Sequence, residues 1–158
     1  MIATEQVPGI TPVVCFQDMP LRAIVENIRY EKYLREEKGM PKKRYSPFGI
    51  RIEKRYAFRL GARPVVYEKN SDYKDVLTPD NYWRYVAMDY ESKGQYADWA
   101  HEREWRSKDD FHFDYTFIAV ALPTDRYYRK FIEDCIKRER MDILSSIMAI
   151  DVLMNDLL

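Results

Sequence analysis

The sequence is poor in the residues that build metal sites, disulfide frameworks and phosphate-binding loops. Its 158 residues include 2 cysteines and 2 histidines, with no Cys-x-x-Cys pair and no zinc-type histidine repeat. Glycine totals 5, and no Gly-x-Gly-x-x-Gly, Gly-Lys-Ser/Thr or Gly-x-Ser-x-Gly motif occurs. The sequence therefore predicts no zinc finger, no Walker-type or dinucleotide-binding loop, and no α/β-hydrolase serine; no metal site is expected.

The chain also lacks a charge bias and a long apolar run. Lys+Arg and Asp+Glu both total 26, so no global field favours nucleic acid or an anionic membrane. A nucleic-acid contact would need a local patch such as Lys42-Lys43-Arg44, which is more typical of a solvated turn. No apolar stretch approaches membrane-spanning length, and no secretory leader pattern is present. We expect a cytoplasmic protein with Cys15 and Cys135 reduced, no membrane contact and no nucleic-acid partner.

The composition and periodicity predict one α+β domain over residues 1–158. The apolar fraction is 46%, which is enough for a hydrophobic core. Residues 1–12 are expected to form an extended arm. The predicted strands and helices follow from alternating and 3.6-residue patterns. The strands are 13–16, 50–52, 64–67 and 111–122, and the helices are 20–37, 53–60, 124–140 and 143–158. Residues 82–90 fit a strand or a helix equally well, and the pattern over 50–67 predicts a compact βαβ unit.

The last two helices form an expected C-terminal pair over residues 124–158. The final one is nearly apolar all round, so it needs a partner surface: this domain's own sheet, a second copy or another protein.

The strongest candidate for a catalytic site is the stretch His101-Glu102-Arg103-Glu104-Trp105-Arg106, which places two carboxylates two residues apart. On a β-strand, Glu102, Glu104 and Arg106 share one face. Two carboxylates on one face can perform acid–base chemistry, because repulsion and burial separate their pKa values. The alternative is an amphipathic edge strand whose acids face water.

A second candidate is the pair Tyr45 and Tyr56, which are separated by ten residues. Two tyrosine rings at this spacing can hold a planar ligand between them. The chain has 13 tyrosines, so such a pair also arises by chance, and both rings can instead pack in the core.

Four blocks together resemble the AbiGi-type abortive phage infection proteins of bacteria. In chain order they are Val14-Cys15-Phe16-Gln17-Asp18-Met19-Pro20-Leu21, Tyr45-Ser46-Pro47-Phe48-Gly49-Ile50, Gly61-Ala62-Arg63-Pro64-Val65-Val66-Tyr67 and Glu102-Arg103-Glu104-Trp105-Arg106. That family is associated with phage resistance and toxin–antitoxin loci, and is similar to the ADP-ribosyltransferase fold. The resemblance implies a mixed sheet with flanking helices.

The resemblance also implies roles for individual residues. Glu104 would stabilise the oxocarbenium-like transition state as NAD is cleaved, and Glu102 would position or deprotonate the acceptor. Tyr45, Ser46 and Tyr56 would form the nicotinamide site. Relatives carry a first-strand His or Arg, and no such residue precedes Arg22 here. Two hypotheses follow: an NAD-dependent mono-ADP-ribosyltransferase, or a non-catalytic interaction or antitoxin module on the same fold.

Overall fold

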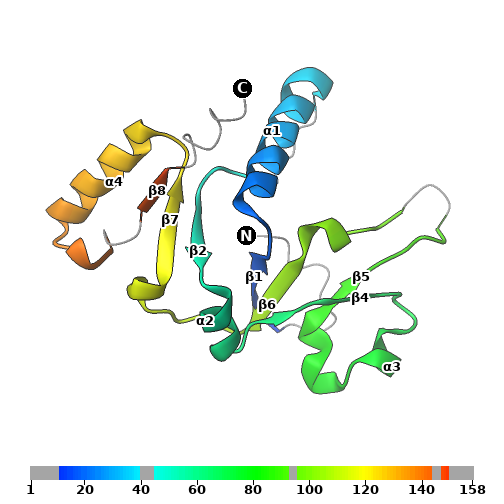
Figure 1. The fold of residues 1–158 in the computed structure, drawn as a ribbon. Coiled ribbons are helices and arrows are strands. Elements are labelled where there is room, and N and C mark those ends of the chain that lie inside the picture. The colour runs from blue at the N-terminus through cyan, green and yellow to red at the C-terminus, as the bar shows by residue number, and fades with distance from the viewer. Residues whose placement is uncertain (1–10, 40–44, 93–95, 144–146, 150–158) are drawn as a thin grey trace. The chain divides into compact units, whose positions relative to one another are not determined.

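The chain is a mixed α and β protein that divides into two compact units (Figure 1). The computed structural model describes residues 11–39, 45–92, 96–143 and 147–149. The first unit comprises Met1–Met19 and Lys54–His112, and the second comprises Pro20–Glu53 and Phe113–Leu158. The predicted α+β class is confirmed, whereas the single domain stays a prediction. Most of the expected N-terminal arm lies outside the described residues.

The first unit is built on an antiparallel sheet of order β1–β6–β3. Figure 1 shows β1 beside β6. Its strands are β1 (Val13–Gln17), β6 (Glu104–Lys108) and β3 (Arg63–Pro64). The register runs from Val13 opposite Lys108 to Gln17 opposite Glu104. The central strand therefore carries the Glu-Trp-Arg sequence, held on both sides by hydrogen-bonded neighbours.

A smaller parallel pair, β4 (Val66–Glu68) with β5 (Tyr85–Ala87), completes the strands of this unit. The crossover between them contains α3 (Tyr73–Val76) and the 3-10 helix η2 (Pro79–Arg84). The buried rings of Tyr73 and Tyr85 stack with centroids 4.2 Å apart. This crossover resolves the ambiguous segment 82–90, which is 3-10 helix up to Arg84 and strand from Tyr85.

The predicted βαβ unit over 50–67 is wrong. Strand β2 (Gly49–Ile52) belongs to the second unit and pairs there with β7 (Ile118–Leu122). Helix α2 (Lys54–Arg59) and strands β3 and β4 belong to the first unit. The elements exist, but local periodicity does not specify which strand supplies the hydrogen-bond partners. The apolar sequence of residues 118–122 offers β2 a longer ladder than the two-residue β3 could.

The second unit contains a sheet of order β2–β7–β8. Strand β7 (Ile118–Leu122) pairs antiparallel with β2 and parallel with β8 (Ile147–Ala149), and α4 (Asp125–Lys137) packs against both β7 and β8. Helix α1 (Leu21–Lys38) ends at Gly39, whose left-handed backbone (φ 62°) closes the last turn. This unit also contains the 3-10 helices η4 (Tyr115–Phe117) and η5 (Met141–Ile143).

Two predictions in this unit need correction. The strand expected over 111–122 begins only at Ile118, because Asp114 accepts a hydrogen bond from the Thr116 amide (2.8 Å) and starts η4. The C-terminal helical pair is wrong over its described part: residues 147–149 are a strand, while 150–158 lie outside the described residues. An apolar run without clear periodicity fits a buried strand as well as a buried helix.

A buried acid–arginine site on the central strand

Glu104 and Arg106 form a buried ion pair on β6. They are two residues apart on a strand and so project from the same face. The Arg106 Nε donates to Glu104 Oε1 at 2.8 Å, and Nη2 donates to Oε2 at 3.4 Å. The exposed fractions are 7% for Glu104 and 5% for Arg106. Both carboxylate oxygens are thus engaged by one guanidinium in a site largely closed to water.

The same guanidinium also holds the backbone of the neighbouring crossover. Arg106 Nη1 donates to the carbonyl oxygens of Trp83 (3.1 Å) and Tyr85 (2.8 Å). These carbonyls lie where η2 ends and β5 begins. Arg106 therefore joins the two sheets of the unit while Glu104 balances its charge.

Glu102 is buried as well, but it lies in a 3-10 helix and not on the predicted strand. It ends the 3-10 helix η3 (Ala100–Glu102) and is 9% exposed, while the strand starts only at Glu104. Between them Arg103 adopts a left-handed conformation, φ 47° and ψ 49°. The prediction that Glu102 lies on the strand is wrong, because the left-handed conformation of Arg103 interrupts the extended backbone between Glu102 and Glu104.

The strain at Arg103 gives a direct test of this geometry. Left-handed backbone costs a residue with a Cβ about 1–2 kcal/mol, a cost that glycine avoids. We therefore expect Arg103→Gly to be about 1 kcal/mol more stable than Arg103→Ala in urea unfolding. Both variants lose the ion pair of Arg103 with Asp18 (3.4 Å), so its loss cancels in the comparison.

Arg55 on α2 is the matched control for that pair of variants. In a helix the order reverses, and Arg55→Gly should be less stable than Arg55→Ala by about 0.5–1 kcal/mol. Equal stability of the two Arg103 variants would show that residue 103 is not held in the left-handed region.

Tyr67 and Cys15 adjoin the ion pair. The Glu104 amide donates to the Tyr67 hydroxyl at 3.1 Å. Burial raises the pKa of Tyr67, and the negative charges of Glu104 and Glu102 also raise it. Cys15 lies opposite Arg106 in the β1–β6 register. Burial, a hydrogen bond with Glu104 and the charge of Glu104 raise the pKa of the Cys15 thiol to about 11.

The predicted site residues do not all fall in one unit. Glu102 and Glu104 lie together in the first unit with Tyr56, whose ring centroid is 5.8 Å from the Arg59 guanidinium carbon. Tyr45 and Ser46 belong to the second unit. The tyrosine found beside the acids is Tyr67, which the sequence analysis did not assign. Tyr67 is the last residue of the block Gly61–Tyr67 that resembles the abortive-infection family, and this position is the feature of the sequence that could have identified it.

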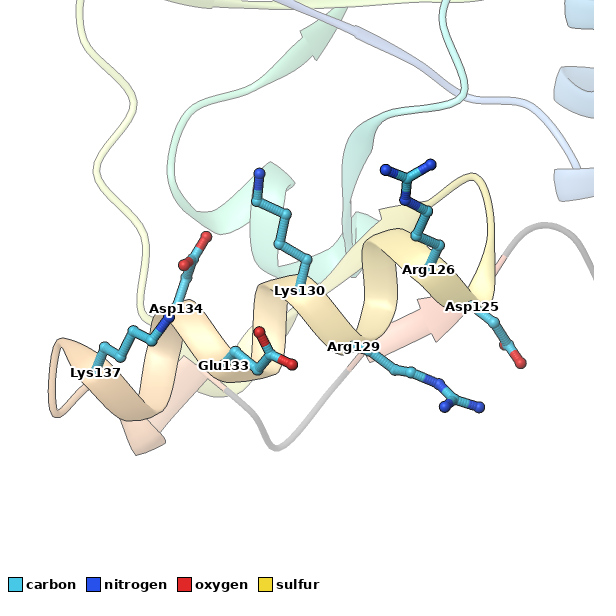
Figure 2. A pocket seen from close by; sticks show the side chains of 7 residues that line it. All are labelled: Asp125, Arg126, Arg129, Lys130, Glu133, Asp134 and Lys137. Atoms are coloured by element: carbon cyan, nitrogen blue, oxygen red, sulfur yellow. The ribbon is translucent and has the colours of Figure 1, made fainter.

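A surface depression lies on α4 (Figure 2). It is lined by Asp125, Arg126, Arg129, Lys130, Glu133, Asp134 and Lys137. All seven are charged residues of one helix, and their side chains project from it in several directions (Figure 2). The depression is therefore typical of a solvated helix face, and none of the predicted site residues lines it.

Residues 11–39, 45–92, 96–143 and 147–149 contain no group of three or more histidine, cysteine or acidic side chains arranged to hold a metal ion. No helix within these ranges is long and apolar enough to cross a bilayer. Comparison with known proteins found no matching family model, characterised protein or solved structure.

Proposed function

We propose that this chain is a phage-defence protein of the abortive-infection type that acts as a non-catalytic interaction or antitoxin module. Two lines of support are independent of each other. The first is the resemblance of four sequence blocks, in order, to that family. The second is the state of Glu104, which is the residue that a transferase of this type would need.

The occupied carboxylate of Glu104 carries the proposal. Cleavage of a glycosidic bond develops positive charge on the sugar, and a carboxylate must face that charge to stabilise it. Both Glu104 oxygens instead bind Arg106, and the residue is 7% exposed. Arg106 neutralises the carboxylate and is itself fixed by two carbonyls. The pair is thus arranged as a structural brace of the unit.

The fold is proposed to be ADP-ribosyltransferase-like. This rests on the resemblance, together with the position of the Glu-Trp-Arg sequence on the central strand of an antiparallel sheet. In such a protein the ancestral catalytic strand would be retained for stability while the partner surface carries the function.

A second candidate is NAD-dependent mono-ADP-ribosyl transfer, and one observation favours it. Glu102, Glu104 and Tyr67 form a cluster of buried or half-buried polar side chains, an arrangement frequent at catalytic sites. Against it, the Arg106 guanidinium already binds the Glu104 carboxylate that would have to face the NAD ribose.

The two candidates differ in what NAD does when mixed with the protein. For the non-catalytic module we expect no heat of NAD binding by calorimetry and no release of nicotinamide by chromatography. Nicotinamide release by the wild-type protein that disappears in Glu104→Gln would establish the transferase instead. Glu26→Gln is the matched control, because Glu26 is an exposed acid on α1.

The interaction function has its own readout. We expect sedimentation velocity to show self-association that grows with protein concentration. A strict monomer that binds NAD tightly would contradict the proposal.

A further inference from the structure

A patch of positive charge lies on the first unit, although the chain as a whole is neutral. Residues 54–67 read Lys-Arg-Tyr-Ala-Phe-Arg-Leu-Gly-Ala-Arg-Pro-Val-Val-Tyr, with four cations and no acid. The stretch covers α2, β3 and part of β4. Lys54 forms an ion pair with Asp18, so three of these cations, Arg55, Arg59 and Arg63, make up the local excess within a chain whose formal net charge is +0. Such a local excess attracts anions even without a global field.

Arg63 is fixed in place by this stretch. Its Nη1 donates to the carbonyl oxygens of Phe58 (2.7 Å) and Ala62 (2.8 Å). Its guanidinium carbon lies 3.8 Å from the centroid of the Phe58 ring, in a cation–π contact. These contacts use one face and one nitrogen of the guanidinium. The N–H groups on Nε and Nη2 form no hydrogen bond within the described residues.

Arg84, at the end of η2, binds the backbone of the same short segment. Its Nε donates to the carbonyl oxygen of Pro64 at 2.9 Å, one residue beyond Arg63. Burial lowers the pKa of the Arg84 guanidinium, and the neighbouring charge of Arg63 lowers it further. In the part of the chain that the structure describes, no carboxylate forms an ion pair with either arginine. Arg106 lies opposite Arg63 in the β3–β6 register, but Glu104 already balances the positive charge of Arg106.

We infer that Arg63 and Arg84 bind a phosphate group. The two guanidiniums are held by carbonyls of the same short segment, Arg63 at Ala62 and Arg84 at Pro64, and their charges repel each other. A ligand with nearly two negative charges relieves that repulsion. A phosphate monoester carries about −1.5 to −2 at neutral pH and accepts forked hydrogen bonds from planar guanidinium groups. A single carboxylate balances only one of the two arginines. Arg55 and Arg59, one helical turn apart on α2, extend the positive surface.

Phosphate can come from two sources: a small phosphorylated molecule, whose terminal phosphate carries nearly two charges, or a nucleic-acid backbone, where each phosphodiester carries one charge and two adjacent phosphates are needed. Two probes distinguish them: pyrophosphate measured by calorimetry, and a fluorescein-labelled single-stranded oligonucleotide measured by anisotropy. An oligonucleotide contact should weaken steeply as salt rises, because binding releases condensed counterions. Pyrophosphate binding without oligonucleotide binding identifies a small molecule.

The test compares Arg63→Gln/Arg84→Gln with Arg126→Gln/Arg129→Gln. Both double variants change the net charge equally, and Arg126 and Arg129 lie on α4 in the second unit (Figure 2). We expect the first variant to weaken binding of at least one probe about tenfold or more, the size expected for lost charged hydrogen bonds, and the second to leave it unchanged. Arg84→Gln alone is the safeguard if the double variant fails to fold, since Arg84 makes a single backbone hydrogen bond.

Three results would overturn the inference. The first is that the wild-type protein binds neither probe. The second is that both double variants weaken binding equally, which would indicate a diffuse charge effect. The third is that polyglutamate binds as tightly as either phosphate probe, which would assign the two arginines to an acidic protein partner.

Discussion

Replacing Arg106 by methionine is expected to lower the free energy of unfolding by about 3–5 kcal/mol. The variant leaves the Glu104 carboxylate in a site where only 7% of the residue is exposed, with no cation to balance it. It also removes the donor that serves the Trp83 and Tyr85 carbonyls. Urea unfolding followed by circular dichroism, extrapolated linearly to water, measures the loss.

The double variant Glu104→Leu/Arg106→Met separates the value of the pair from the cost of breaking it. Removing both charges together is expected to restore the part of the loss that comes from the unpaired carboxylate. The part that comes from the Trp83 and Tyr85 carbonyls remains, because their donor is still missing. The exposed pair Arg22–Glu26 on α1 provides the control: Arg22→Met should cost no more than about 0.5 kcal/mol. A loss in Arg106→Met no larger than in this control would show that the pair is solvated rather than buried.

This experiment also bears on function, because it tests Glu104 without assuming a substrate. A residue retained as a brace should lose stability when changed, and a residue retained for catalysis should lose activity while stability holds or rises. Glu104→Gln keeps the shape and removes the charge that faces Arg106. A drop in stability with no change in any NAD-dependent signal is the expected combination.

Local sequence patterns predicted the elements better than their pairing. The apolar run at 13–16 is a strand, and the stripe predicted over 124–140 forms α4. The sequence pattern pairs β2 with the wrong neighbours and predicts a helix for residues 147–149. In both cases the deciding contact is with β7, which is distant in sequence from β2 and from β8. Periodicity reports which face is apolar, not which strand completes the ladder.

The candidate site was predictable only in part. A period of two placed Glu104 and Arg106 on one face, and their carboxylate–guanidinium contact follows from that spacing. The same period failed at Glu102, because Arg103 departs from extended backbone and no sequence rule assigns a left-handed conformation to an arginine. The Trp83 and Tyr85 carbonyls could not be predicted at all, since backbone acceptors carry no sequence signature.

The Cys15 thiol is expected to react slowly with alkylating reagents. The thiolate is the reactive form, and the pKa of this thiol is raised from 9.0 to about 11. Near pH 8 the thiolate population should therefore be about 100-fold smaller than for an unperturbed thiol. Iodoacetamide labelling resolved by peptide mass spectrometry should show Cys15 reacting about 100-fold more slowly in the native protein than in urea. Equal rates would show that Glu104 and burial do not act on the thiol.

The same shift fixes the sign of a pH effect on stability. Between pH 9 and about 11 the unfolded chain releases the Cys15 proton more readily than the folded chain, so the contribution of this thiol to stability is complete below pH 9 and falls as the pH rises. Lysines and tyrosines titrate in the same range, so the measurement is the difference between the wild-type protein and Cys15→Ala, followed by urea unfolding at several pH values. The wild-type protein should lose stability more steeply than the variant above pH 9. Parallel curves would contradict the raised pKa, which burial and then Glu104 cause.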